Sequence, residues 1–320
     1  MSRKYHHLST GPNSSPTTNS STGLLYAVAG FAVLAVGDAV VKSMAGAWPA
    51  YAVAALRFSI GALALSAMLW RSEGPRAFVP VNLWLQIGRG ACVAIASMAF
   101  FSAIYIMPLA EALAIGFLAP ILTQVFAGLL LGERVRPKVY LISLIALAGV
   151  AIILRPNLAL LGWAALLPLV SAVFFSLLMV ANRASAGQGS ALSMQVFVAA
   201  FAAPILIAAA IAAKLSGVPA LDFGWPSWDV VARCAFVAIT ASTAHWLAYI
   251  GTSKAGAAQV APAIYVQMLV AVTLGWLFFD EVPDGWTLLG AGLIIAAGLY
   301  LWRDGLHAEA AMVQRVATRL

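Results

Sequence analysis

The strongest constraint on this chain is a succession of long apolar segments, each close to the length that a helix needs to cross a bilayer. About 20 apolar residues in helical conformation span the hydrocarbon core, and the sequence supplies ten such segments, mostly with short connections between them. We therefore predict an all-α membrane protein with ten transmembrane helices near residues 24–45, 49–70, 83–106, 109–131, 137–155, 160–182, 191–213, 229–250, 257–279 and 285–303.

The composition indicates the same class and argues against several others. Hydrophobic residues make up 63% of the 320 residues and charged residues 9%, whereas about a quarter of a soluble domain is charged. The basic residues lie in short connections and form no continuous basic face, so the sequence does not predict nucleic-acid binding. Cys92 and Cys234 lie within apolar segments and indicate no disulfide framework. No catalytic, metal-binding or cofactor motif occurs, so we expect no enzyme, no metal site and no cofactor.

The two halves of the chain are similar to each other. A shift of 148 residues places Glu133 on Glu281, and a shift of 144 places Arg89 on Arg233. Each half holds five spans, and because five is odd, the second half must enter the membrane upside down relative to the first. The expected organisation is two inverted five-helix repeats at 23–156 and 157–303, with a disordered cytoplasmic tail at 1–22 and a cytoplasmic C-terminal tail at 304–320.

The distribution of positive charge predicts the orientation. The connection L-G-E-R-V-R-P-K at 131–138 is rich in Arg and Lys, whereas F-F-D-E-V-P-D at 278–284 contains neither. Because Lys and Arg favour the cytoplasmic side, we expect both termini in the cytoplasm and the protein in the inner (plasma) membrane. The cytoplasmic segments then contain Arg3, Lys4, Arg71, Arg76, Arg134, Arg136, Lys138, Arg183, Lys254, Arg303, Arg315 and Arg319, and the external ends only Lys42, Arg155 and Lys214.

Several segments resemble a known family. The run P-L-A-E-A-L-A-I-G-F-L-A-P-I-L-T-Q-V-F-A-G-L-L-L-G-E-R-V at 108–135 and the pair Arg57–Phe58 resemble the EamA-type repeat of the drug/metabolite transporter superfamily. The second half keeps this outline at 261–284, and the likeness covers about residues 23–303. It departs from the pattern at Met268, which stands where the first half has Pro120.

The resemblance implies a secondary transporter that works by alternating access. Its cavity would be lined by the first four spans of each repeat, with the fifth and tenth spans packed outside. The partners would be the lipid bilayer and a small organic metabolite, and a monomer would be sufficient. The resemblance suggests export of amino acids, including aromatic ones, or of related compounds, with vitamins, amines and nucleotide derivatives as alternative cargoes.

Three charged residues of the first two spans are candidates for a gate or an ion pair. Asp38 and Lys42 lie four residues apart and share a helix face, and Arg57 lies at a depth similar to that of Asp38. Asp38 and Arg57 are expected to pair, either as a structural link between two helices or as a gate or substrate contact. Lys42 is expected to extend toward the outer surface.

Two arginines and one histidine are further candidates. Arg89 and Arg233 begin the third and eighth spans, where each would serve as an interfacial anchor or as an anion contact at a mouth of the cavity. His245 lies inside the eighth span beside Trp246, and its alternatives are a core hydrogen bond and a role in substrate or proton binding. Tyr105 and Tyr249 are expected in the aromatic belts at the membrane interfaces.

Two spans that contain proline are candidates for the substrate site. Pro120 precedes Gln124, and Pro262 precedes Tyr265 and Gln267. A proline inside a helix frees a backbone carbonyl that protein, water or ligand must satisfy in lipid, although a simple packing kink is the alternative. At about 100° per residue, Tyr265 and Gln267 lie on opposite faces, and we expect Tyr265 to be the one that faces the centre.

Two other classes of function fit the sequence less well. A membrane-embedded enzyme acting on lipid-linked substrates would use His245 as a base, with Ser242 as its nearest polar neighbour in sequence. A passive channel is disfavoured because no ring of like charges and no repeated filter sequence occurs.

The inverted arrangement predicts the result of a labelling experiment. In intact cells, Arg136→Cys should be shielded from a membrane-impermeant thiol reagent and Asp284→Cys should react with it, because the two connections are expected on opposite sides. Reaction of both cysteines from the same side would contradict the inverted repeat.

Overall fold

The computed structural model describes residues 16–132, 137–256 and 260–317, and these residues form helices and connections without strands. The first half contains α1 (Pro16–Lys42), α2 (Ala50–Glu73), η1 (Pro75–Phe78), α3 (Leu83–Ile106), α4 (Leu109–Gly116), α5 (Ala119–Leu131) and α6 (Pro137–Leu161). The second half contains η2 (Gly162–Leu166), α7 (Leu167–Ala184), α8 (Ala191–Leu215), η3 (Pro219–Leu221), α9 (Trp228–Ala255), η4 (Ala261–Tyr265), α11 (Val266–Phe279) and α12 (Gly285–Ala317).

The predicted fold class and number of spans are confirmed. Within the described residues, ten helical segments are long and apolar enough to cross a membrane. The fourth predicted span is not one helix, because the chain turns at 117–118 between α4 and α5. The described part of the N-terminal segment also differs from the expected disorder, since α1 already begins at Pro16.

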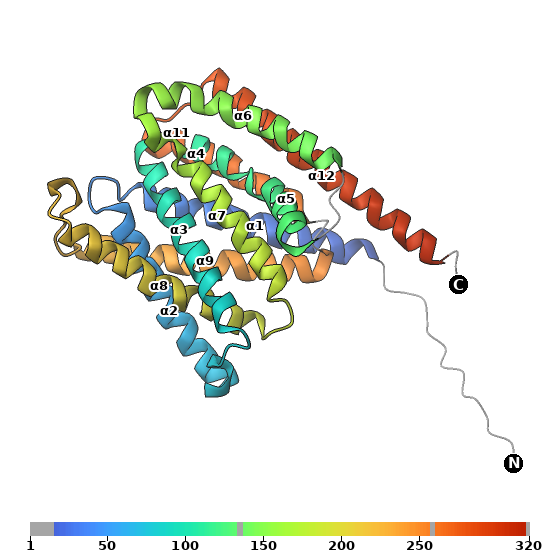
Figure 1. Ribbon diagram of the computed structural model, residues 1–320, viewed down its shortest axis with the longest axis horizontal. Coiled ribbons are helices and arrows are strands. Elements are labelled where there is room, and N and C mark those ends of the chain that lie inside the picture. Colours follow the sequence, from blue (N-terminus) through green and yellow to red (C-terminus); the bar gives the residue numbers. More distant parts are fainter. Residues whose placement is uncertain (1–15, 133–136, 257–259, 318–320) are drawn as a thin grey trace, which may run out of the picture.

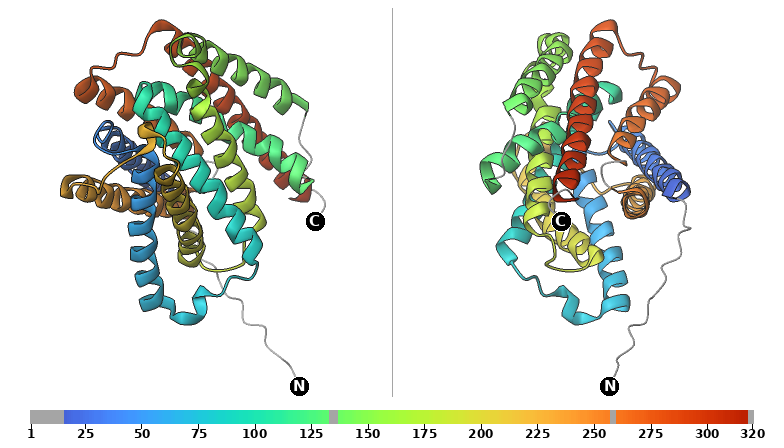
Figure 2. Two further views of the ribbon diagram at one scale, coloured as in Figure 1. Left: turned by 60° about the vertical axis from the view of Figure 1, so that its left-hand side comes forward. Right: turned by 90° about the vertical axis from the view of Figure 1, so that its right-hand side faces the viewer.

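Helix packing follows a pattern that is preserved when the two halves are exchanged. In both views of Figure 2 and in Figure 1, α6 runs along α12, and α2 packs against α8. The pair α3–α7 corresponds to the pair α9–α1, and α5–α7 corresponds to α11–α1. This exchange symmetry is the packing expected of two related units.

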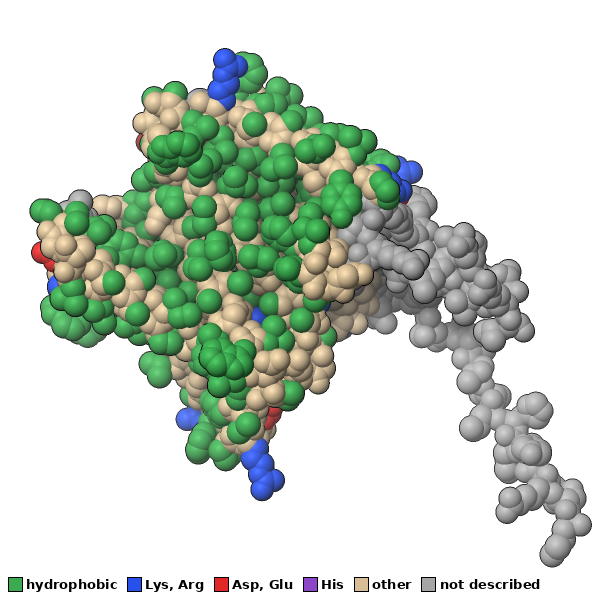
Figure 3. All heavy atoms as spheres, in the orientation of Figure 1, with side chains coloured by type: hydrophobic (Ala, Val, Ile, Leu, Met, Phe, Trp, Pro, Cys, Tyr) green, Lys and Arg blue, Asp and Glu red, His purple; other side chains and the backbone are tan. Residues whose placement is uncertain are grey.

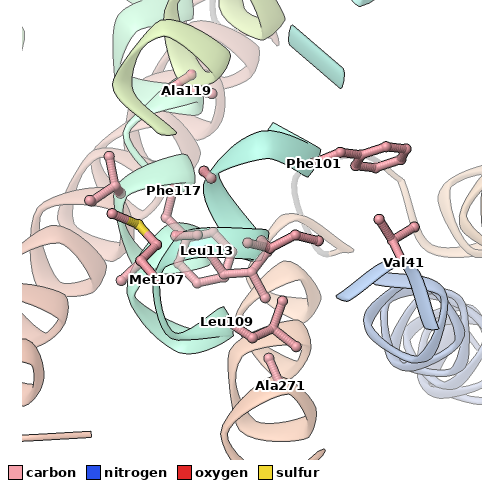
Figure 4. Close-up of a cluster of buried hydrophobic side chains, with 14 of the residues drawn as sticks. Val41, Phe101, Met107, Leu109, Leu113, Phe117, Ala119 and Ala271 are labelled. Carbon is pink, nitrogen blue, oxygen red and sulfur yellow. The ribbon is translucent and has the colours of Figure 1, made fainter. Parts of the chain in front are cut away.

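The buried core gathers around α4, as Figure 4 shows. Leu109, Leu113 and Phe117 point from α4 and its C-terminal turn toward Val41 of α1 and Ala271 of α11. All five side chains are almost fully buried. The short helix α4 packs against α11, α7 and α12 and also contacts α1 and α3.

The outer surface is apolar, as expected for helices that face lipid. Figure 3 shows one such face, covered by hydrophobic side chains with charged groups mainly at its edges. Leu63, Ile239 and Leu269 are each more than 60% exposed within their spans. Trp84 and Trp228 are exposed next to the ends of α3 and α9, which is where tryptophan gathers at membrane interfaces.

Glycines allow close contact between α6 and α12. A Cβ atom on Gly290 would lie 2.6 Å from the carbonyl oxygen of Gly149, and a Cβ atom on Gly149 would lie 2.7 Å from that of Gly290. In lipid, where helices gain little from excluding water, such close backbone contact is an important source of helix association. The contact leaves no room for a methyl group on either helix.

This contact predicts opposite effects for two alanine substitutions on α12. Gly290→Ala should force α12 away from α6 and destabilise the protein by about 1–3 kcal/mol, seen as a lower melting temperature in detergent. Gly292→Ala is the matched control, because a Cβ atom there would meet nothing within 4 Å, and alanine favours the helix. Equal melting temperatures for the two variants would contradict a tight α6–α12 contact.

Candidate functional site

The first polar contact inside the bundle joins α1 to α11. Asp38 is buried, and the Nε2 atom of Gln267 donates a 2.9 Å hydrogen bond to its Oδ2 atom. The expected direct ion pair between Asp38 and Arg57 does not form, although the two charges interact electrostatically. The carboxylate of Asp38 is therefore held by an amide from the second half of the chain.

Arg57 lies between aromatic rings. Its guanidinium carbon is 4.5 Å from the ring centroid of Phe58 and 5.6 Å from that of Phe101 on α3. Such stacking is favourable for a guanidinium group because the ring faces carry negative potential. The side chain is only partly buried.

Gln267, and not Tyr265, faces the first span, which corrects the expected rotation of the ninth span. The two side chains do lie apart as predicted, but Tyr265 packs edge-on against Phe117 with ring centroids 5.4 Å apart. Its hydroxyl lies against Gly298 of α12, where a Cβ atom would come within 2.0 Å of it. Substrate binding by Tyr265 stays a prediction, and the geometry favours a packing role.

The two proline-containing spans break at equivalent places, at 117–118 between α4 and α5 and at 265–266 between η4 and α11, but their prolines lie on different sides of the break. Pro120 lies in the first turn of α5, directly after the turn that ends α4. Pro262 lies in the first turn of η4, at the start of the described part of its span rather than at the membrane centre. Gln124 is partly buried on α5, which packs against α7, so it does not join Gln267 on α11.

Lys42 is buried and does not extend to the surface, contrary to the prediction. Its Nζ atom lies 2.6 Å from Oε1 of Glu281 and donates hydrogen bonds of 2.8 Å and 2.7 Å to the carbonyl oxygens of Ile104 and Met107. These carbonyls lie at the end of α3, where helical hydrogen bonding stops and leaves acceptors free. The ammonium group is thus surrounded by acceptors from two other segments.

Glu281 is held from a second direction. Its Oε2 atom accepts a 2.9 Å hydrogen bond from the backbone N–H of Leu109, the first residue of α4. The α11–α12 connection is therefore fixed to α1 and to the start of α4 at once. We name the contacts among Lys42, Glu281, Leu109, Ile104 and Met107 the outer lock, because they lie at the expected external end.

A second polar cluster reinforces this end. Glu111 accepts a 2.6 Å hydrogen bond from Asn157 of α6 and a 3.1 Å bond from the hydroxyl of Thr287 on α12. Asp284 accepts a 2.7 Å bond from the backbone N–H of Thr287 and so caps α12. The bonds from Thr287 hold the pKa of Asp284 below its usual value.

Arg89 is buried among helices and does not line a mouth of the cavity. Its Nε atom donates a 2.7 Å hydrogen bond to Asn182 of α7, and its Nη1 atom contacts Gln86 and the sulfur of Met194 on α8. It therefore links α3, α7 and α8. Arg233 pairs with Asp229 on its own helix at 2.8 Å and donates to the carbonyl of Ser43, so it ties α9 to the end of α1.

His245 and Trp246 lie on an exposed part of α9. Trp246 is 63% exposed, and His245 is exposed as well. Within the described residues, His245 has no hydrogen-bond partner, so the expected core hydrogen bond is not formed.

Sequence reasoning placed Tyr105 in an aromatic belt and missed its buried hydroxyl. That hydroxyl is enclosed by protein and has no hydrogen-bond partner in the described chain. Phe101, whose ring Arg57 covers, lies four residues earlier on α3. The i, i+4 spacing of Phe101 and Tyr105 was the available signal, because it places both rings on one face of the helix.

Comparison with known proteins identifies the family. The chain matches the model of the EamA-like transporter family twice, over residues 21–155 and 162–303. The chain belongs to this family. The resemblance drawn from the sequence is thereby confirmed, and the protein is a multi-pass membrane transporter of small molecules.

Curated relatives of this EamA-like protein have different cargoes. The pseudopaline exporter CntI of Pseudomonas aeruginosa is 30% identical over 88% of this chain and 96% of its own. The riboflavin transporter of Rhizobium johnstonii is 28% identical over 71% and 72%, and the S-adenosylmethionine uptake transporter of Rickettsia bellii 24% over 68% and 72%. A crystal structure with 22% identity superposes with a TM-score of 0.57 over 91% of this chain and 99% of the other, which shows the fold alone.

The outer lock makes a prediction about stability. Glu281→Ala should remove the counter-ion of a buried ammonium group and destabilise the protein by about 3–5 kcal/mol. Glu281→Gln should destabilise the protein less than Glu281→Ala does, because the amide oxygen can still accept a hydrogen bond from Leu109 or Lys42. The readout is the melting temperature in detergent, with Glu73→Ala, an exposed carboxylate at the end of α2, as the control. Equal melting temperatures for Glu281→Ala and Glu73→Ala would contradict the lock.

Proposed function

We propose that the protein moves a small organic metabolite across the inner membrane by alternating access, and that it exports amino acids or related compounds. The observation that carries this proposal is the polar centre formed by Asp38, Gln267 and Arg57. An α-amino acid has one cationic and one anionic group, which match a carboxylate and a guanidinium within reach of each other.

The packing of the helices supports an alternating-access mechanism. Asp38 lies on α1 of the first half and Gln267 on α11 of the second, so relative movement of the two halves would change the surroundings of a bound molecule. In many carriers, two inverted repeats rock around a site at their interface. The exchange symmetry of the helix pairs and the double match to the family model are consistent with this arrangement.

The relatives differ in cargo and in direction of transport, so both the cargo and the direction of this protein are proposals. They include an exporter and an uptake transporter. Riboflavin is a vitamin and S-adenosylmethionine a nucleoside derivative, and both belong to the alternative cargoes for this chain. Export is supported by the likeness to the pseudopaline exporter, which extends over 88% of the chain.

The competing enzyme hypothesis gains no support from the geometry. Ser242, its second group, donates its hydroxyl hydrogen bond to the carbonyl of Ala238 at 2.9 Å rather than to His245. A base and its partner need to lie within hydrogen-bonding distance in a plausible site.

A ligand screen tests the proposed cargo. Amino acids that bind the folded protein should raise its melting temperature, because ligand binding stabilises the native state by about 2.7 kcal/mol at a hundredfold excess over Kd. Compounds that shift the melting temperature are then tested for transport in proteoliposomes. Asp38→Asn, which removes one charge of the polar centre, should reduce transport.

One outcome of the screen would overturn the proposed amino-acid cargo without overturning the proposed transport function. Shifts and transport with flavins or nucleosides, and none with any amino acid, would replace the amino-acid proposal by the vitamin or nucleotide alternative. Full transport of an amino acid by Asp38→Asn would show that the charge of Asp38 has no part in the site.

A further inference from the structure

The cationic side chain of Arg57 lies inside a membrane span and has no polar partner in the described chain. A guanidinium group has five N–H donors, yet within the described residues none of them has a hydrogen bond or ion pair, and its contacts are the rings of Phe58 and Phe101. An unsatisfied donor at this depth costs several kcal/mol. The side chain is partly exposed, so water or a ligand can supply the acceptors.

Two aromatic rings restrict the position of Arg57. Their centroids lie 4.5 Å and 5.6 Å from the guanidinium carbon, and neither ring accepts the N–H groups as a carboxylate oxygen would. A guanidinium group presents pairs of parallel donors that match the two oxygens of a carboxylate. A planar anion is therefore a suitable partner for this arginine.

A further polar group without a partner lies on the helix that supplies the ring of Phe101. The hydroxyl of Tyr105 is buried and has no hydrogen-bond partner in the described chain. Tyr105 follows Phe101 by four residues on α3, so it lies on the same face of the helix as the ring that Arg57 covers. Two spans, α2 and α3, therefore bring polar groups without partners to the same face of α3.

Asp38 limits the negative charge of a ligand that can bind beside Arg57. Its carboxylate lies within electrostatic reach of Arg57 but is bound to Gln267. The carboxylate of Asp38 repels a ligand that carries one negative charge less strongly than it would repel a doubly charged phosphate. The same carboxylate can attract an ammonium group on the bound molecule.

We propose that Arg57 and the hydroxyl of Tyr105 form a subsite for the carboxylate of the transported molecule, which also carries an ammonium group that faces Asp38. This subsite rests on the proposed transport of amino acids and adds the group by which they are recognised. The guanidinium edge binds the two carboxylate oxygens, and Tyr105 donates a further hydrogen bond. The substrate class is then a zwitterion with a free carboxylate.

Binding of acids and their amides by the purified full-length protein tests the subsite. The probes are L-phenylalanine, L-tryptophan and L-leucine, each compared with its carboxamide, and dissociation constants are taken from the rise in melting temperature with concentration. We expect the wild-type protein to bind at least one acid, and to bind that acid about tenfold or more tighter than its amide, because a hydrogen bond to a charged group is lost in the amide.

Three variants separate a binding role from a structural one. Arg57→Gln should weaken binding of the acids about tenfold or more and leave binding of the amides unchanged. Tyr105→Phe should also weaken acid binding without lowering the melting temperature of the empty protein, because the lost hydroxyl has no partner there. Arg71→Gln, an exposed arginine on the same helix as Arg57, is the control and should bind like the wild type.

The outcomes distinguish failure of the subsite from failure of the proposed function. Equal binding of acids and amides, or acid binding by both Arg57→Gln and Tyr105→Phe at wild-type strength, would overturn the subsite while amino-acid transport stands. If none of the acids binds, the subsite is overturned. Transport of a flavin or nucleoside in the same preparation would then overturn the cargo as well.

Discussion

The ammonium group of Lys42 shows the constraint on which the structure depends: a charge inside the membrane must be satisfied by protein. Three oxygen atoms surround it within 2.8 Å, two from the end of α3 and one from Glu281. The carboxylate that completes this set also receives the first N–H of α4. One buried cation therefore determines where α1, α3, α4 and the α11–α12 connection lie relative to one another.

Some polar groups of the bundle have partners within the protein, and others have none. At the expected external end, Lys42, Glu111 and Glu281 have their partners within the protein. Arg57 and the hydroxyl of Tyr105, by contrast, have none in the described chain. Because lipid supplies no hydrogen bonds, the paired groups hold the helices together, and the unpaired groups are left for a molecule that enters from water.

The ten spans and the family were predictable from the sequence because lipid imposes a fixed length and apolar composition on each helix. The connection around Glu281 was predictable as a polar turn, but its partner was not, since Lys42 lies 281 − 42 = 239 residues earlier. No local pattern encodes a contact at that separation. The expectation that Lys42 would extend to the surface considered only its own helix, whereas the acceptors lie at the end of α3.

The orientation of the ninth span shows a second limit. Helical periodicity separated Tyr265 from Gln267 correctly, but which of them faces the centre depends on the rotation of the helix about its axis. That rotation matches partners on other spans: Gly298 leaves room for the tyrosine hydroxyl, and Asp38 accepts from Gln267. Pro262 was expected near mid-span, but it lies in the first turn of η4, and the change from η4 to α11 follows at 265–266.

The long separation between partners has a consequence for how the chain is made. Asp38 enters the membrane with α1, but Gln267, its hydrogen-bond partner, follows 229 residues later, and Glu281 follows later still. During synthesis, the first span therefore carries an acidic group without its final partner, and a basic group without its counter-ion, at a cost of a few kcal/mol per charge. The acceptors from α3 reach Lys42 early, but a chain that stops before α11 never supplies the amide for Asp38 or the carboxylate for Lys42.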